Sequence, residues 1–539
     1  MIRKINIILL ALSIIIGVGC SEDYLDTKPT DAISAGDALS SPENMMLVLE
    51  GLHRQMYAQT PLPDADYSRS GQSHFLPSFD AIGGNIIHSS PGNGWMTSDL
   101  QWNTHTNATY ETPRSLWYQR YHFIASANSI INAVEEGDFV DDEELNNILG
   151  QAHAYRAWAY HQLVMTYSKG YLIGDPATDP GVPLLLSTGA PYTSEPRGTV
   201  QEVYDQIEID IENAIDYLEN ASSAKNKSHI SLNAAYGIKA RIDLSKGDWS
   251  EAADAAVEAR EGYDLMDEEA WKSGFNTYEL SEVIWGGRVI SEETNYYASF
   301  FYYVSPTFNG AQNKSNPKII NKEVYNQIPD TDYRKDAWLP LAPNTNSNAS
   351  NGEGGSYEDD PNYDNEEDFL NAWQDIITTY GMTDGHNTHP YMTVKFLQKN
   401  PGTIDPDDVI YMRSSEMYLI EAEARAMNDD ITGAQDALGV LGEERDSDYD
   451  KTAFTTKEEI MEEVKFQRHV ELWGEGFSFH DHIRWDDVHD MENSGAAQVL
   501  YQDGYYQDKP SENPRWVWKI PQREIDANPN LTEADQNQY

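Results

Sequence analysis

The only cysteine of the chain, Cys20, stands where its thiol could be chemically modified. Arg3 and Lys4 precede an apolar run over residues 7–18, and Cys20 follows closely behind that run. A basic start before a short apolar run indicates a secretion signal, because a membrane-spanning helix needs about 20 apolar residues. We therefore predict a signal peptide over residues 1–19 and interpret Cys20 as the lipid acceptor of a bacterial lipoprotein.

Aromatic side chains that carry a polar group point to ligand binding. The chain has 33 Tyr and 13 Trp but only 14 Phe. A phenol or indole ring presents a flat apolar face while its O–H or N–H reaches water. A sugar offers a matching surface, since its apolar C–H faces are surrounded by hydroxyl groups, although some of these rings must belong to the core.

The acidic run SYEDDPNYDNEED is a weak candidate for a calcium site. Asp360, Asn362, Asp364 and Glu366 alternate along it, as oxygen ligands do in a calcium loop. Asn365 stands where the EF-hand loop requires glycine. We favour a solvated acidic loop and keep calcium as the alternative.

Catalytic chemistry finds little support in the sequence. No nucleophile elbow, phosphate-binding loop or HExxH motif is present. His480, His482 and His489 could ligate a metal, but we expect Asp481 and Arg484 beside them to form structural ion pairs. A glycosidase uses a pair of carboxylates, but in a chain with 89 acidic residues such a pair would be no evidence for hydrolase activity. We predict no metal and no cofactor.

The charge balance excludes one class of partner. The 89 acids outnumber the 37 bases, which gives a formal net charge of -52. Binding to phosphate backbones requires clustered Lys and Arg, so nucleic acid is not an expected partner. At 40% hydrophobic residues the chain is nevertheless globular.

Apolar residues at three- and four-residue spacing predict long amphipathic helices in two parts of the chain, about 115–263 and 408–490. Within them a pattern occurs twice that is typical of tetratricopeptide repeats, in which small residues let two helices approach closely. Its first copy consists of Ala240, Gly247-Asp248-Trp249, Ala252 and Ala259, and its second of Ala422 and Ala434, with Asp429 in place of the turn glycine.

The remaining sequence predicts an irregular lobe. Residues 24–114 are rich in Gly, Pro, Ser and Asn, with a short helical pattern around 44–57, and residues 264–407 contain short aromatic runs and low-complexity loops. A block of that length is too long to be a loop without structure of its own. We predict a mainly α protein: a tetratricopeptide-like scaffold of helical pairs that carries a large irregular ligand-binding lobe.

Four stretches distributed over the mature chain resemble the SusD/RagB family of Bacteroidetes outer-membrane lipoproteins. They are Cys20–Asp26 with Pro29; Leu116, Trp117, Tyr121, Ile124 and Asn128; Ala152, Arg156, Ala157, Tyr160, Leu163 and Tyr167; and Arg468, Glu471, Glu475, Gly476, Asp481, Arg484 and Trp485.

The resemblance implies a function as well as a fold. Members of this family capture oligosaccharides, or in some cases peptides, outside the cell and pass them to a SusC-like TonB-dependent transporter, on which they sit as a lid. They are not enzymes. Glu22 and Asp23 directly after Cys20 resemble the signal that sends such lipoproteins to the cell surface. We therefore expect a lipid-anchored protein on the outer face of the outer membrane.

The same resemblance places ligand contacts in the two irregular regions, where the loops have no fixed motif. By position and chemistry we favour Trp95 and Trp102 as stacking surfaces, with Asp80, Asn85 and Asn103 as hydrogen-bonding groups. From the inserted region we add Tyr296, Tyr297 and Tyr302.

Three alternatives to a glycan-binding lipoprotein remain open. The first is a peptide-binding uptake protein of the RagB kind, because stacking rings and amides also suit peptides. The second is a secreted glycoside hydrolase, and the third is a tetratricopeptide scaffold that binds only proteins.

Overall fold

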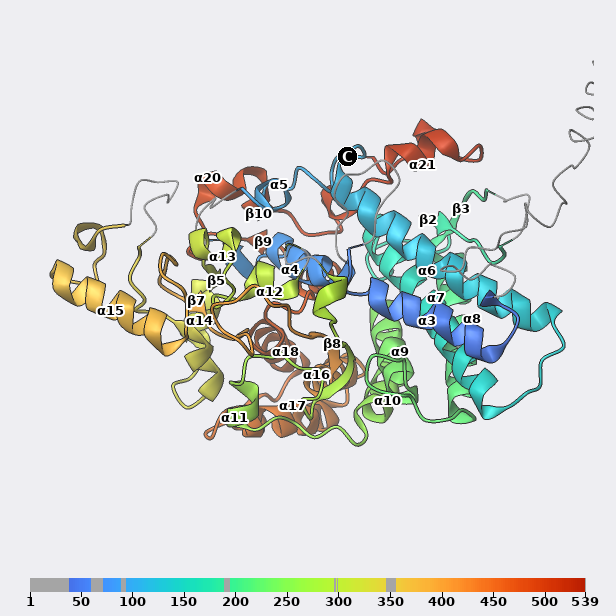
Figure 1. Cartoon of the computed structure of the whole chain (residues 1–539), viewed down its shortest axis with the longest axis horizontal. Coiled ribbons are helices and arrows are strands. Elements are labelled where there is room, and N and C mark those ends of the chain that lie inside the picture. The colour runs from blue at the N-terminus through green and yellow to red at the C-terminus, as the bar shows by residue number, and fades with distance from the viewer. Residues whose placement is uncertain are drawn as a thin grey trace, which may run out of the picture.

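The computed structural model describes residues 38–59, 71–88, 94–188, 194–294, 297, 299–345 and 355–538. It is mainly α-helical, with long helices on one side and short elements on the other (Figure 1). The mainly α prediction is confirmed. Within the described ranges, no helix combines the length and the apolar character that crossing a membrane requires.

The first long helices are α6 (Glu111–Glu136), α7 (Glu143–Tyr167) and α8 (Val200–Glu219). Asp142 caps α7 by accepting hydrogen bonds from two backbone N–H groups of its first turn. Gly150 brings α7 close to α8, because a Cβ atom at this position would lie 2.5 Å from the Leu218 side chain. Most of the α7 side chains are buried, so this helix forms the centre of the helical side.

The two predicted repeat hairpins are present. The first pairs α9 (Leu232–Lys246) with α10 (Trp249–Arg260), and the second pairs α16 (Ser414–Met427) with α17 (Ile431–Arg445). Gly247 has φ 83° in the first turn, and Asp429 takes the same left-handed conformation, φ 62°, in the second. The small residues of the pattern are fully buried, as close helix packing requires: Ala240, Ala252, Ala259, Ala422 and Ala434.

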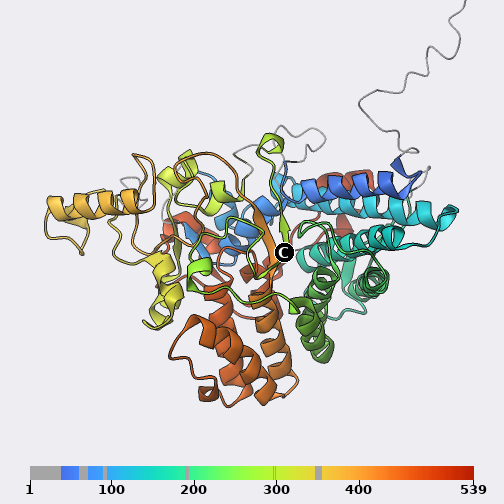
Figure 2. The same cartoon turned by 60° about the horizontal axis from the view of Figure 1, so that its bottom comes forward.

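Helix α18 (Lys457–Glu471) lies with α16 and α17 at the bottom of the rotated view in Figure 2, whereas α19 (Ser478–Trp485) packs in the core against residues 71–82. The other helices are short: α3 (Pro42–Gln55), α4 (Gly71–Ile82), α5 (Thr97–Leu100), α11 (Glu268–Trp271), α12 (Phe300–Val304), α13 (Ala311–Ser315), α14 (Lys322–Gln327), α15 (Glu366–Thr379), α20 (Gln498–Tyr501) and α21 (Gln522–Ala527).

Short antiparallel strands connect distant parts of the chain. A four-stranded sheet has the order β1-β5-β7-β6, and three strand pairs are β2 with β3, β4 with β8 and β9 with β10. The strands are β1 (Ile86–His88), β2 (Pro180–Pro183), β3 (Arg197–Thr199), β4 (Val283–Gly287), β5 (Lys318–Ile320), β6 (Trp338–Leu339), β7 (Met392–Thr393), β8 (Val409–Arg413), β9 (His489–Asp490) and β10 (Tyr506–Gln507).

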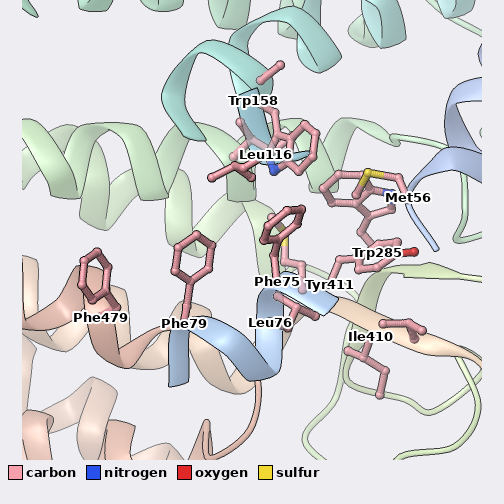
Figure 3. Close-up of a cluster of buried hydrophobic side chains, with 14 of the residues drawn as sticks. Met56, Phe75, Leu76, Phe79, Leu116, Trp158, Trp285, Ile410, Tyr411 and Phe479 are labelled. Atoms are coloured by element: carbon pink, nitrogen blue, oxygen red, sulfur yellow. The ribbon is translucent and has the colours of Figure 1, made fainter. Parts of the chain in front are cut away.

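Helix α4 was not predicted, because its sequence GQSHFLPSFDAI looked like irregular chain. All twelve of its residues are buried. Figure 3 shows Phe75, Leu76 and Phe79 of α4 between Trp158 of α7 and Phe479 of α19. A wholly buried helix lacks the alternation of polar and apolar faces on which helix prediction depends, so tertiary packing and not local pattern produces α4.

A network of buried charges joins the two sides of the molecule. Glu471, at the end of α18, is fully buried and faces three guanidinium groups. Its carboxylate oxygens lie 2.8 Å from Arg334 Nη1, 2.5 Å from Arg413 Nη1 and 3.2 Å from Arg445 Nε. Burial alone would raise the pKa of Glu471, but Arg445, Arg413 and Arg334 outweigh it and hold that pKa well below its usual range.

Neighbouring charges complete this network. Glu282 pairs with Arg413 at 2.8 Å and also with Arg445, while Glu475 pairs with Arg413 and Lys395, each at 2.8 Å. Asp332 pairs with Arg334 at 2.7 Å. The four cations, Lys395 and the three arginines, therefore meet four carboxylates. Charges buried in this way are tolerated because each has opposite charges within hydrogen-bond distance.

We predict that Glu471→Gln lowers the free energy of unfolding by about 3–5 kcal/mol, since it leaves buried guanidinium groups without their central counter-charge. Chemical denaturation followed by circular dichroism measures this loss. Glu458→Gln, an exposed position of the same helix, is the matched control and should leave stability nearly unchanged. Equal stability of both variants would contradict the central role of Glu471.

Buried histidines make the fold sensitive to acid. Burial lowers the pKa of His105 and His161 to about 3 and that of His480 and His489 to about 4. An unfolded chain protonates these imidazoles near the ordinary value of 6.5, whereas the folded chain keeps them neutral. Stabilisation is therefore complete above pH 6.5 and is lost as the pH falls toward 4, by about 1.4 kcal/mol per histidine and pH unit.

Carboxylates oppose this trend, because burial raises the pKa of Asp80, Asp243 and Asp407 to about 6. The histidines with a lowered pKa outnumber these carboxylates. We therefore predict that the urea concentration at the midpoint of unfolding decreases as the pH is lowered from about 7 to about 5. His480→Gln should lower the number of protons that the chain takes up on unfolding in this pH range by about one, which makes the midpoint less dependent on pH. A midpoint that stays level over that range would contradict the prediction.

Candidate ligand-binding site

Trp95 lies on a sharp bend after β1. Gly94 before it and Met96 after it both have positive φ, 84° and 61°. A left-handed conformation is uncommon for a side chain such as Met, and residues of this kind concentrate at functional sites. The Trp95 ring is partly exposed, and its indole N–H has no hydrogen-bond partner in the described part of the chain. This ring can therefore offer both an apolar face and a donor to a ligand.

Two tyrosines complete an aromatic platform with Trp95. The Tyr297 ring is nearly parallel to Trp95, with 5° between the planes and 6.3 Å between the centroids. Tyr302 stands edge-on to both, with centroids 5.5 Å from each and angles of 76° and 81°. Tyr297 is 43% exposed while Tyr302 is fully buried. We call Trp95, Tyr297 and the supporting Tyr302 the aromatic platform.

Helix α12 supports the platform through Tyr303. Tyr303 of α12 donates a hydrogen bond from its O–H to the Tyr297 carbonyl oxygen at 3.3 Å, and its ring contacts Trp95 edge-to-face. On its other side Tyr303 meets His74 of α4, with 5.2 Å between centroids. Asn313 donates to the carbonyl oxygens of Phe301 and Ser305 and so fixes the turns at the end of α12.

Asp80 anchors α4 and has no exposed surface in this structure. It is fully buried, and its carboxylate accepts hydrogen bonds from the backbone N–H groups of Gly474, at 2.6 Å, and Ser478, at 3.0 Å. Burial raises the pKa of Asp80 to about 6, although these backbone donors act in the opposite direction. Asn85 is buried nearby, and its carbonyl oxygen accepts a hydrogen bond from Trp473 Nε1 at 2.7 Å. Asp80 therefore joins α4 to the segment from Gly474 to Ser478, and the Asn85 backbone joins the turn after α4 to Trp473 in front of that segment.

Trp102 was expected to be a stacking surface, and its burial contradicts that expectation. Its side chain has no exposed surface, so in this structure it cannot stack on a ligand. The ring packs edge-to-face on Trp516 with centroids 4.8 Å apart, and Nε1 donates to the Ile82 carbonyl oxygen at 3.3 Å. The C-terminal segment around Trp516 returns to cover this ring, and no local pattern around Trp102 indicates that contact.

The remaining expected residues fall in three places. Asn103 is exposed on the loop before α6, in a groove that does not include Trp95 or Tyr297. Tyr296 and Cys20 lie outside the described residues. Of the expected set, the structure therefore brings together Trp95, Tyr297 and Tyr302.

The described residues of the acidic run form a turn and a helix start, and not the loop of a calcium site. Asp360 is buried and accepts hydrogen bonds from the backbone N–H groups of Asn344 and Asn362, which makes it a turn residue. Asn365 caps α15 by accepting from Asp368 N, and Glu366 begins that helix, while Asp364 is exposed. In the described ranges no three His, Cys, Asp or Glu side chains are grouped to hold a metal ion. The alternating pattern is explained by a turn followed by a helix cap.

The histidines near the C-terminus lie in a structural region, as expected. Asp481 pairs with Arg468 Nε at 2.7 Å and with Arg484 Nη1 at 2.7 Å. Burial alone would raise the pKa of Asp481, but the two guanidinium groups hold it at about 2.

Tyr303 and His74 were not expected at the site. Tyr303 belongs to the run NYYASFFYYV, and its position directly after Tyr302 is the sequence signal that points to it. His74 had no signal, because α4 itself was not predicted. Ring faces, an indole N–H and tyrosine hydroxyls can bind a ligand with apolar C–H faces and hydroxyl groups.

Two family models match the chain. One, described as starch-binding and associating with the outer membrane, matches residues 79–244, and the other, described as the SusD family, matches residues 258–539, more than half of the chain. A SusD-like protein of Formosa agariphila is 25% identical over 443 residues, which cover 77% of this chain and 78% of the relative.

Solved structures share the fold. A SusD-like carbohydrate-binding protein from Bacteroides vulgatus superimposes with a TM-score of 0.73 at 22% identity and covers 93% of this chain and 98% of its own. Surface glycan-binding protein A from Bacteroides thetaiotaomicron, solved in complex with laminarihexaose, gives a TM-score of 0.63 at 17% identity and covers 92% and 99%. With the family models, the repeat hairpins and the C-terminal block in agreement, the chain belongs to the SusD family.

Proposed function

We propose that this protein is a cell-surface glycan-binding lipoprotein that captures oligosaccharides and delivers them to a SusC-like TonB-dependent transporter. The observation that carries the proposal is the aromatic platform. Its two outer rings are parallel within 5°, so they can contact the apolar faces of a sugar chain in one orientation. The protein acts by binding, and no catalytic step is part of the proposal.

The platform suits capture because it is already formed. Tyr302 is buried and holds Trp95 and Tyr297 edge-on, while Tyr303 fixes the Tyr297 backbone. Rings that do not have to be ordered on binding save conformational entropy, which increases the affinity for a given contact area. The relative solved with laminarihexaose supports an oligosaccharide as the class of ligand.

Family membership supports the proposed attachment and partner. The model that matches residues 79–244 describes association with the outer membrane, and we propose that a lipidated Cys20 provides it, facing the outside of the cell. A cysteine that carries more than one acyl chain anchors stably. Capture beside a transporter raises the local concentration of ligand at its entrance.

We predict that Trp95→Ala and Tyr297→Ala each weaken binding of the recognised oligosaccharide at least about tenfold, because each removes one stacking face. Isothermal titration calorimetry of the protein without its lipid anchor, against a panel of neutral polysaccharides and their oligosaccharides, measures this. Tyr236→Ala on α9, away from the platform, is the control and should leave the affinity unchanged.

Unchanged affinity in both platform variants would remove the platform from the site. Binding only to peptides in a parallel panel would favour the RagB-like alternative. Release of reducing ends from any bound polysaccharide, measured in the same samples, would favour a glycoside hydrolase. No binding to either panel would leave a scaffold that binds only proteins.

We predict that Cys20→Ser moves the protein from the outer-membrane fraction to a fraction not bound to the membrane, because the acyl chains provide attachment. Cell fractionation with immunoblotting measures this, and mass spectrometry of the wild-type terminus should find an acylated cysteine. Wild-type protein without acyl chains, or a Cys20→Ser variant that stays in the membrane, would contradict the prediction.

A further inference from the structure

A second concave surface lies away from the aromatic platform. It is an open groove of about 730 Å³ between the loop before α6 and the C-terminal segment, and ten residues line it. We call it the C-terminal groove. Its volume falls within the range of about 300–1,000 Å³ that is usual for small-ligand sites. Neither Trp95 nor Tyr297 lines it.

Half of the residues that line the C-terminal groove are amides: Asn103, Asn107, Gln522, Gln536 and Gln538. Gln536 is buried and bonds to Ile520 through both of its amide atoms, so the other four are the amides that a ligand can meet. A side-chain amide both donates and accepts hydrogen bonds, as does a sugar hydroxyl, so the two groups complement each other in either direction. Tyr110 adds a ring that is 41% exposed. Amides next to an exposed ring are a suitable combination for a sugar, which needs one apolar face and several hydrogen bonds.

The charge of the groove also selects for this ligand. Lys519 and Glu533 are its two charged residues, so the lining has no net charge although the whole chain carries -52. Its apolar contributors are Ala108 and the Tyr110 ring. A peptide groove usually buries apolar anchor side chains, and such anchor pockets are missing from this lining. An uncharged polyhydroxyl ligand fits better than a peptide or an anionic sugar.

Backbone hydrogen bonds hold the two walls of the groove together. Lys519 N donates to the His105 carbonyl oxygen and Gln522 N donates to the Ala108 carbonyl oxygen, both at 2.9 Å. The Gln536 side chain accepts from Ile520 N at 2.9 Å and donates to Ile520 O at 2.8 Å. The groove therefore exists before any ligand arrives, which lowers the entropic cost of binding.

From this chemistry we infer that the C-terminal groove is a second oligosaccharide-binding subsite, specific for neutral sugars and independent of the aromatic platform. It shares its class of ligand with the proposed function, so the test must read the two sites separately. A chain with two subsites holds a long glycan more tightly than either subsite alone, because binding at the second becomes intramolecular.

Hydrogen–deuterium exchange with mass spectrometry separates the sites by location. The probes are laminarihexaose, maltohexaose, cellohexaose, xylohexaose and a hexapeptide, each at millimolar concentration with the full soluble chain. We expect at least one hexaose to slow exchange in peptides that cover residues 103–110 and 519–538, both in the wild type and in Trp95→Ala. The double variant Asn103→Ala/Tyr110→Ala should lose this protection and bind at that site at least tenfold more weakly.

The double variant is suitable because both side chains are exposed and neither caps α6 by a side-chain hydrogen bond. Gln374→Ala on α15, an exposed amide outside the groove, is the matched control and should keep the protection.

The results distinguish failure of the second subsite from failure of the aromatic platform. Protection of the groove alone supports the second subsite and contradicts the platform, whereas protection around residues 95 and 297 alone overturns the second subsite and leaves the platform. Groove protection that disappears in Trp95→Ala, or persists in the double variant, overturns the independent subsite. Protection by the hexapeptide alone also overturns it, and so does a result in which no probe protects the groove.

Discussion

The fold depends on the buried contact between Glu471 and three arginines. Glu471 ends α18 in the helical side, Arg413 ends β8 and Arg445 ends α17, whereas Arg334 comes from the inserted region between the repeats. These groups are almost fully buried, and desolvating them is costly unless every charge is paired in good geometry. Because one carboxylate serves segments that are far apart in the sequence, the network is satisfied only when all of them are in place. It therefore favours a single arrangement of the irregular region against the helices, which hydrophobic burial alone would not specify.

The aromatic platform takes its position from this centre. The turn after Glu471 supplies the backbone N–H groups of Gly474 and Ser478 that Asp80 accepts from, so it fixes α4. From α4 the contact passes through His74 to Tyr303 and on to Tyr297. Every step is a buried side chain or a directed hydrogen bond. Short loops can thus carry a preformed aromatic platform, because the helices and not the loops determine where the rings stand.

The sequence predicted what depends on local pattern. Periodicity and small residues identified the hairpins around Gly247 and Asp429, because a turn between close helices places strict demands on a few positions. Trp95, Tyr297 and Tyr302 were each proposed as ligand contacts because both irregular regions supply rings, and their position side by side had no signal in the sequence. Burial of Trp102 and the anchoring role of Asp80 could not be predicted, since both result from segments about 400 residues away in the chain: Trp516 covers the first, and Gly474 and Ser478 bind the second. Wholly buried α4 was missed for the same reason.

Charge provides the last constraint on the ligand. A formal net charge of -52 creates a negative field around the protein that repels anionic sugars and keeps the surface hydrated. Salt screens this field beyond about 8 Å at physiological ionic strength, so it acts mainly on ligands already close to the surface. The aromatic platform and the C-terminal groove carry no excess of negative charge. The platform consists of rings, and in the groove Lys519 balances Glu533. A neutral oligosaccharide can approach both without electrostatic cost, whereas an acidic one meets repulsion over the surrounding surface. The charge distribution and the ring geometry therefore both favour the neutral oligosaccharide that we propose as the ligand, by independent physical effects.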